Sequence, residues 1–363
     1  MKLKSDLSDM LRALALACAM LALLLFPQLA SAAVVDALHV CGSMLLPSLF
    51  PFFVCSNLLI ALELHRFPAR ALRRAMPRAF HAAPDGAAAL VLGLLGGYPA
   101  GAQAAAQLYA RGAVSRGEAE RLVRFCNNAG PGFLFGVVGA GVFHSAACGA
   151  ALYLIHILSA VVCGVLLRPA ALPPDIPAAQ DAQTRRISPA AAFTDSVRTA
   201  GQTALQVCMF VVVFGVLSRF LLALLPAQLP ESLRVLLCGM LELGNGAALL
   251  REAALPFAVK FPMAAFLLGF GGISVWAQTV SLLTPHGLRA AGYLPARLLH
   301  GALSALLAMC AALVFPLEAA ALPAMAAETV AFRPLLSAFI PSAVSIFVIF
   351  RNLMTGNSRA DGV

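Results

Sequence analysis

Charged residues are scarce in this sequence. Only 11% of its 363 residues are Asp, Glu, Lys or Arg, whereas 61% are hydrophobic. Because a soluble domain carries about 25% charged residues, this composition excludes a soluble protein and predicts an integral membrane protein embedded in the lipid bilayer. One tryptophan and four tyrosines make only a thin aromatic belt, so arginine side chains are expected to mark the membrane surfaces instead.

Motifs for metal binding and catalysis are missing as well. The nine cysteines show neither CxxC nor CxxH spacing, which argues against a metal site and against a disulfide framework. The sequence contains no GxSxG, HExxH or Walker motif. We therefore predict that the protein is not an enzyme and holds no metal or cofactor. Any pumping is expected to use an ion gradient, with Na⁺ or H⁺ left open as the coupling ion, or a separate partner protein.

Acidic residues are outnumbered by basic ones. The 25 Lys and Arg against 16 Asp and Glu give a net charge of +9. This excess does not indicate nucleic-acid binding, because the arginines lie in short loops between apolar segments, where they mark the cytoplasmic side. The loops 66–84 and 111–124 are both rich in arginine and are both predicted to be cytoplasmic. The apolar segment 86–108 between them is therefore predicted to be a re-entrant hairpin.

Turn residues interrupt four apolar segments near their middles. A hairpin at 86–108 is followed by a broken helix at 119–143, and a second hairpin at 233–255 is followed by a broken helix at 258–283. Broken helices in a membrane leave backbone groups unpaired, which is tolerated only where they line a cavity or contact protein. Matching interruptions in two halves point to the binding site of a secondary transporter. The predicted fold is all-α, with about eight transmembrane helices and two re-entrant hairpins in an inverted repeat.

The polar stretches divide the predicted fold into five parts. Residues 1–33 form an N-terminal transmembrane helix, with a cleaved signal peptide at 1–32 as the alternative. Two repeats at 34–168 and 201–316 are joined by a proline-rich cytoplasmic linker at 169–200, and residues 317–363 form a C-terminal helix and tail. An inverted second repeat places three basic residues outside, against the charge rule: Arg234, Arg251 and Lys260.

Polar side chains at the interruptions are the candidate substrate-binding residues. A carboxylate at membrane depth is costly and is a functional hypothesis by default. Glu242 is therefore predicted to bind substrate, take a proton or help hold Na⁺, and the alternative is a helix cap in a short external loop. Asn127 and Asn128 offer donors and acceptors to a ligand, or they satisfy the backbone freed by Pro131. The other candidates lie at or near the interruptions: Tyr98, Gly101, Gln103, Asn245, Ser274 and Gln278.

Two further polar residues share one face of a predicted helix. Arg297 and His300 are three positions apart, which places them on the same side. Arg297 is expected near the membrane interface, with the alternative that it supplies positive charge to the cavity. His156 is interpreted as an isolated residue that lies at the interface or bonds to a neighbouring helix.

The blocks around the interruptions resemble a known family. They are Gly96-Gly97-Tyr98-Pro99-Ala100-Gly101-Ala102, Cys126-Asn127-Asn128-Ala129-Gly130-Pro131 and Gly269-Phe270-Gly271-Gly272-Ile273-Ser274. They are similar to the sporulation integral membrane proteins of the YlbJ type, which carry nucleoside-recognition (Gate) domains. The resemblance covers residues 40–315.

This resemblance implies a function in sporulation. The family is similar to concentrative nucleoside transporters, and in endospore formers it is implicated in moving dipicolinic acid from the mother cell towards the forespore. It implies a secondary transporter or facilitator of a small anionic or polar metabolite, first of all dipicolinic acid, in the cell membrane, and there in the outer forespore membrane. The alternatives are a nucleoside transporter and a non-transporting membrane scaffold or sensor for spore-envelope assembly. A homo-oligomer is left open.

Overall fold

Helices make up nearly all of the structure. The computed structural model describes residues 2–62, 64, 66–170, 188–226, 228–315 and 317, and these residues contain no β-strand. The all-α prediction is confirmed for this part of the chain. Most of the predicted linker and the predicted C-terminal helix lie outside the described residues.

The first two helices meet at a bend, and the second continues into the third as one long rod. Helix α1 (Lys2–Leu25) is followed directly by α2 (Pro27–Val40), which begins with a proline because that position needs no N–H donor. A π-helical turn at Cys41–Leu45 joins α2 to α3 (Leu46–Ala61) without a break. In that turn the Leu46 N–H donates to the Cys41 carbonyl five residues earlier, so the helix continues through the prolines of α3.

The remaining elements follow in the same order in each half of the chain. The first half, after α4 (Arg66–Leu72), contains α5 (Gly86–Gly96), α6 (Ala100–Ala110), α7 (Arg116–Cys126), the π-helix η3 (Gly132–Ala140) and α8 (Ala146–Leu166). The second half contains α9 (Pro189–Leu224), α10 (Glu231–Leu241), α11 (Leu243–Glu252), α12 (Phe257–Phe270), α13 (Ile273–Leu283) and α14 (Tyr293–Val314). Both halves therefore run from a long helix through a hairpin and a broken helix to a single helix.

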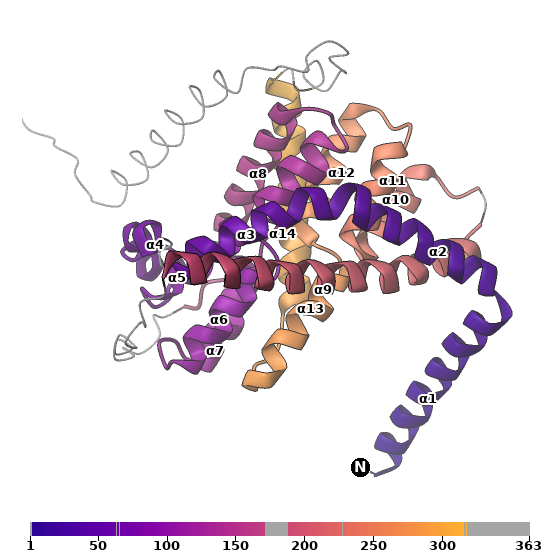
Figure 1. Ribbon diagram of the computed structural model, residues 1–363, viewed down its shortest axis with the longest axis horizontal. Coiled ribbons are helices and arrows are strands. Elements are labelled where there is room, and N and C mark those ends of the chain that lie inside the picture. The colour runs from indigo at the N-terminus through magenta and orange to yellow at the C-terminus, as the bar shows by residue number, and fades with distance from the viewer. Residues whose placement is uncertain are drawn as a thin grey trace, which may run out of the picture.

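The long helices of the two halves lie side by side in opposite directions. Asp36 in α2 pairs with Arg219 late in α9, and Asn57 in α3 donates to the Ser196 carbonyl early in α9. Figure 1 shows this pair crossing α8 and α14 at a steep angle. An antiparallel pair is what an inverted repeat requires, and the inverted repeat and its re-entrant hairpins remain predictions.

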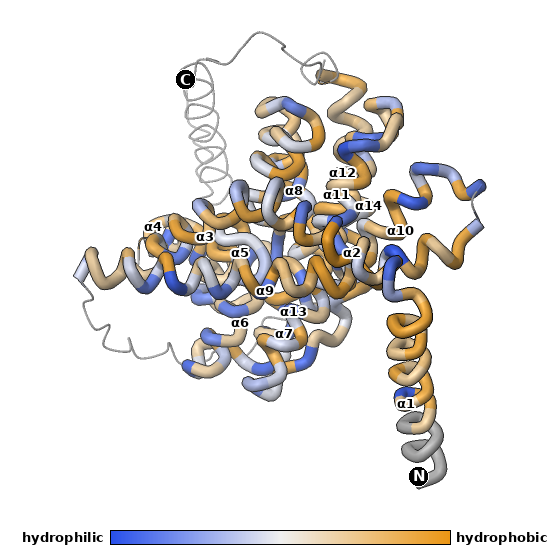
Figure 2. Tube along the Cα trace, turned by 45° about the vertical axis from the view of Figure 1, so that its right-hand side comes forward, coloured by the Kyte–Doolittle hydropathy of each residue, from blue (hydrophilic) through white to orange (hydrophobic). Residues whose placement is uncertain are grey.

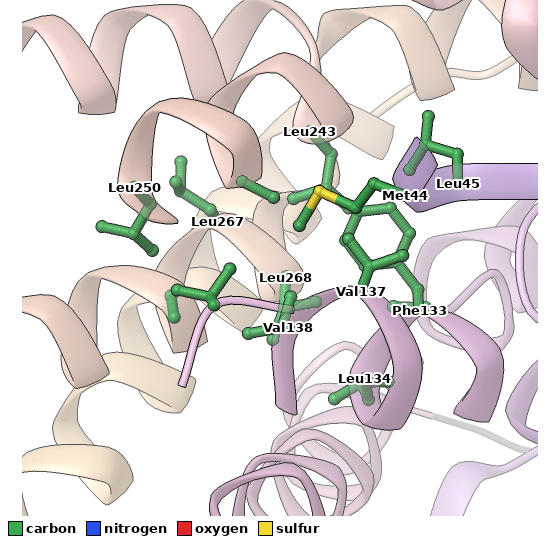
Figure 3. Close-up of a cluster of buried hydrophobic side chains, with 14 of the residues drawn as sticks. Met44, Leu45, Phe133, Leu134, Val137, Val138, Leu243, Leu250, Leu267 and Leu268 are labelled. Atoms are coloured by element: carbon green, nitrogen blue, oxygen red, sulfur yellow. The ribbon is translucent and has the colours of Figure 1, made fainter. Parts of the chain in front are cut away.

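The main core lies where the two halves meet. Figure 3 shows apolar side chains from the π-helical turn Cys41–Leu45, from η3, from α11 and from α12 packed into one cluster. Leu45, Leu134 and Leu267 are each at most 1% exposed. Burial of this kind fixes η3 against α12, and so it fixes the ends of both broken helices relative to each other.

The outer surface of the long helices is strongly apolar. Leu205, Met209 and Val213 on α9 are each more than half exposed, at 57–58%, and Figure 2 shows hydrophobic residues along most of α1 and α9. Exposed apolar surface of this extent marks contact with lipid or with another protein. We infer that this surface faces lipid.

Five helical stretches of the described residues are long and apolar enough to cross a membrane: Pro27–Leu58, Ala146–Leu166, Pro189–Leu224, Phe257–His286 and Tyr293–Val314. The other predicted spans are not among these five stretches, each for its own reason. The apolar part of α1, Met10–Leu25, is short, the segment 119–143 is divided between α7 and η3, and the segment 334–352 lies outside the described residues.

Candidate functional site

The four interruptions predicted from the sequence meet at the centre of the structure. The turn between α5 and α6 approaches the break between α7 and η3, and a Cβ added to Gly97 would lie 2.8 Å from the Gly130 nitrogen. The turn between α10 and α11 approaches the break between α12 and α13, and a Cβ added to Gly272 would lie 3.4 Å from the Glu242 Cα. Each hairpin tip therefore rests on the broken helix of its own half.

One hairpin tip also reaches the other half. A Cβ added to Gly271 would lie 2.7 Å from the Tyr98 hydroxyl oxygen, and this hydroxyl donates to the Leu268 carbonyl at 3.1 Å. Gly271 and Gly272 have φ of +84° and +89°, a backbone conformation that glycine adopts readily. The two glycines thus let α12 end abruptly and leave room for both hairpin tips.

A small cavity lies between the interruptions. It has a volume of about 50 Å³ and is lined by α3, both hairpin tips, the start of η3, α9 and α13. Most of its wall is apolar, and the polar side chains that line it are Tyr98, Glu242 and Gln278. Ligand pockets commonly measure about 300–1,000 Å³. A ring-sized ligand therefore needs the tips to move apart.

Glu242 both caps a helix and lines this cavity. Its Oε2 accepts a hydrogen bond from the Asn245 N–H at 2.6 Å, and the residue is 5% exposed. A carboxylate at a helix N-terminus is stabilised by the free N–H groups and by the helix dipole. The two interpretations of Glu242, a helix cap and a carboxylate at the site, therefore describe the same side chain.

Asn127 and Asn128 are completely buried behind the cavity rather than in its wall. The Asn127 amide donates to Thr279 Oγ1 at 2.9 Å and to the Tyr293 hydroxyl at 3.0 Å. The Asn128 amide donates to the Phe125 carbonyl at 2.8 Å, in the last turn of α7. These bonds satisfy the broken backbone and join the two halves. A direct contact of either residue with a substrate remains a prediction.

The other predicted site residues are dispersed. Gly101 packs α6 against the end of α7, and Ser274 is buried with an Oγ that has no hydrogen-bond partner among the described residues. Asn245 donates to the Val211 carbonyl and lines a second cavity of about 310 Å³ between α2, α9 and the hairpin α10–α11. Gln103 is exposed on α6. The structure thus brings Tyr98, Glu242 and Gln278 to the central cavity.

A buried arginine lies directly behind Tyr98. Arg297 is 0% exposed, so it lies inside the protein rather than on its surface, and its place near the membrane interface remains a prediction. Its guanidinium donates to the Tyr98 hydroxyl at 2.6 Å, to Asn128 Oδ1 at 3.4 Å and to the Phe270 carbonyl at 3.5 Å. It also lies over the Tyr98 ring, 5.6 Å from the ring centre.

Two histidines complete this buried polar cluster. His300 Nδ1 accepts from Arg297 at 2.9 Å, and His300 Nε2 donates to the His156 carbonyl at 3.2 Å. His156 Nε2 accepts from the Ala129 N–H at 3.1 Å, and the two rings lie 4.5 Å apart. The interpretation of His156 as an isolated residue missed this pair. Its only signal in the sequence was a polar residue inside an apolar span.

Together, these features define a multi-pass integral membrane protein with a polar centre between two sets of interrupted helices. The chain is 32% identical over 316 residues to the sporulation integral membrane protein YlbJ of Bacillus subtilis (strain 168), and the match covers 78% of each protein. The chain therefore belongs to the YlbJ family of sporulation integral membrane proteins, as its sequence blocks indicate. No family model matches the chain, and no solved structure matches it.

Proposed function

We propose that this protein is a secondary transporter or facilitator of a small anionic or polar metabolite during sporulation, with dipicolinic acid as the first substrate to test. The observation that supports this most is the convergence of both hairpin tips and both broken helices on one cavity. Interrupted helices at matching places in two halves characterise the substrate sites of secondary transporters. A scaffold has no need for four interruptions that meet.

A helix end beside the cavity favours an anion. Gly132 begins η3 and lines the cavity, whereas the N-terminus of α11 is already capped by Glu242. The N-terminus of a helix presents free N–H groups and the positive end of the helix dipole. A carboxylate group of the substrate can be bound by such N–H groups without a basic side chain in the cavity wall.

Glu242 provides the expected link to a proton. An ionised carboxylate in the cavity would repel an anionic substrate, whereas a protonated one can donate a hydrogen bond to it. Proton uptake by Glu242 and anion binding therefore favour each other. This makes H⁺, rather than Na⁺, the coupling ion that we propose.

Uptake of radiolabelled dipicolinate into proteoliposomes tests this function. Purified protein should take up dipicolinate faster than protein-free liposomes do, and an inward proton gradient should increase the rate. Radiolabelled uridine, measured in parallel, tests the nucleoside alternative. Uptake of neither compound above the protein-free control would contradict transport and leave the scaffold as the better hypothesis.

A further inference from the structure

Arg297 is a buried charge that has no carboxylate partner in the part of the chain that the structure describes. No ion pair joins it to an Asp or Glu among the described residues. Burying an ion costs several kcal/mol unless nearby groups compensate it, and a guanidinium keeps its charge even when it is buried. Other groups around Arg297 must therefore supply the negative potential that holds it in place.

These groups lie at the C-terminal ends of the two half-helices. The Phe270 carbonyl, which accepts from Arg297 directly, belongs to the last residue of α12. The Tyr98 hydroxyl accepts from Arg297 and donates to the Leu268 carbonyl in the last turn of α12. Asn128 accepts from Arg297 through Oδ1, while its amide binds the last turn of α7. The Arg297 guanidinium thus bonds directly to the C-terminal end of α12, and it reaches the C-terminal end of α7 through Asn128.

The positive charge of Arg297 is nearly balanced by the negative partial charges of the two helix ends. Each helix C-terminus carries about half of a negative elementary charge, so the ends of α7 and α12 together offset about one positive charge. In secondary transporters with broken helices, unwound carbonyls and the C-terminal ends of half-helices coordinate the coupling Na⁺. Here the guanidinium of Arg297 in α14 places its positive charge beside such helix ends.

We propose that Arg297 is a tethered cation that replaces a free coupling cation, so that the protein binds and moves its substrate without any requirement for Na⁺. This inference rests on the proposed function and leaves Glu242 as the group that couples protons.

The first experiment measures the Na⁺ dependence of transport. Initial rates of dipicolinate uptake by the unaltered protein should agree within about twofold when NaCl is replaced by choline chloride at equal ionic strength, since a twofold change is under 1 kcal/mol. A tenfold faster rate in NaCl would overturn the tethered cation and leave the proposed function intact. Absence of uptake in both salts would contradict the proposed function instead, and the second experiment then decides the inference.

The second experiment measures thermal stability and requires no substrate. Arg297→Ala leaves a space beside the exposed carbonyl ends, so a few millimolar guanidinium chloride should raise its melting temperature by about 2–4 °C by mass action. Equal choline chloride should not raise it, and the unaltered protein should respond to neither salt. A guanidinium-independent melting temperature of Arg297→Ala would overturn the inference.

Further variants separate the charge from the packing. Arg121→Ala is the matched control, because Arg121 is also buried and donates to the carbonyls of Phe80 and His81 but lies away from the interruptions. Its uptake should stay independent of Na⁺. If Arg297→Ala does not fold, Arg297→Lys and Arg297→Met replace it: the lysine variant should melt at the higher temperature, and the reverse order would overturn the inference.

Discussion

The two broken helices share one geometry and differ in chemistry. The first break carries polar side chains of its own, because Asn127 and Asn128 follow α7 immediately and the Asn128 amide binds the last turn of that helix. The Ala129 N–H in this break donates to His156 of α8. The second break consists of Gly271 and Gly272, which have no side chains to offer. The carbonyls just before these glycines accept hydrogen bonds from other elements: that of Leu268 from Tyr98 in the other half, and that of Phe270 from Arg297 in α14.

For the hairpin tips the order is reversed: the second half carries the more polar side chain. The first tip is neutral and contributes Tyr98, whereas the second contributes the carboxylate of Glu242. The first half therefore combines a neutral tip with an amide-rich break, and the second half combines an acidic tip with a glycine break. Glycine at the points of close approach maintains the shared geometry, while a few polar side chains determine what each half binds.

The largest expected effect comes from filling the glycine break. Gly272→Leu should abolish dipicolinate uptake, because Gly272 has a φ of +89° and an added Cβ would lie 3.3 Å from the Leu241 oxygen and the Leu243 nitrogen. The side chain would strain the backbone and push the second tip away from the break. Gly201→Leu is the control, since an added Cβ there meets nothing within 4 Å. Normal uptake by Gly272→Leu would show that substrate does not bind between this tip and this break.

The next effect tests the charge of the second tip. Glu242→Gln should lower uptake by about tenfold or more and abolish its stimulation by a proton gradient, because the amide cannot take up a proton. Protein levels should stay normal, since the glutamine oxygen can still accept from the Asn245 N–H. Glu231→Gln is a matched control, because Glu231 also accepts a backbone N–H, that of Ala254, but is exposed. Unchanged proton stimulation in Glu242→Gln would reduce Glu242 to a helix cap.

The sequence predicts the positions of the interruptions well, for a local physical reason. Clusters of glycine and proline interrupt helices, and the structure ends α5 at Gly96 and α12 at Phe270, at the residues where the blocks begin to turn. Single prolines do not: Pro51 and Pro262 lie inside α3 and α12. The same local argument could not find the partner of Arg297. Tyr98 and Arg297 are separated by 199 positions, and helix periodicity gives a face but not the neighbour of that face.

Position near a tip also does not reveal which way a side chain points. Gln103 and Gly101 both follow the first tip, yet Gly101 packs tightly against α7 while Gln103 is exposed. The spacing of two residues turns a helix by more than half of a circle, so neighbours at a tip face different surroundings. This is why the prediction named a connected set of site residues and the structure separates them.

A moderate effect is expected from the amide-rich break. Asn128→Ala removes bonds to the Phe125 carbonyl and to Arg297 without touching the cavity wall. Each of these bonds contributes about 0.5–1.5 kcal/mol to stability rather than to substrate binding, so the melting temperature of Asn128→Ala should fall by about 2–4 °C. Ser274→Ala is the control and should have no effect, because the Ser274 Oγ bonds to none of the described residues. An equal effect of both variants would contradict this difference between bonded and unbonded groups.

The smallest effect is expected at Gln103, in comparison with the glutamine of the other half. Gln278 lines the cavity, so Gln278→Ala should weaken dipicolinate binding by about threefold to tenfold, as for the loss of one hydrogen bond. Gln103→Ala removes the same amide from an exposed position on α6 and should leave binding unchanged. Isothermal titration of both purified variants measures the difference directly. Weaker binding in Gln103→Ala alone would place the substrate on the outer face of the first hairpin, away from the point where the four interruptions meet.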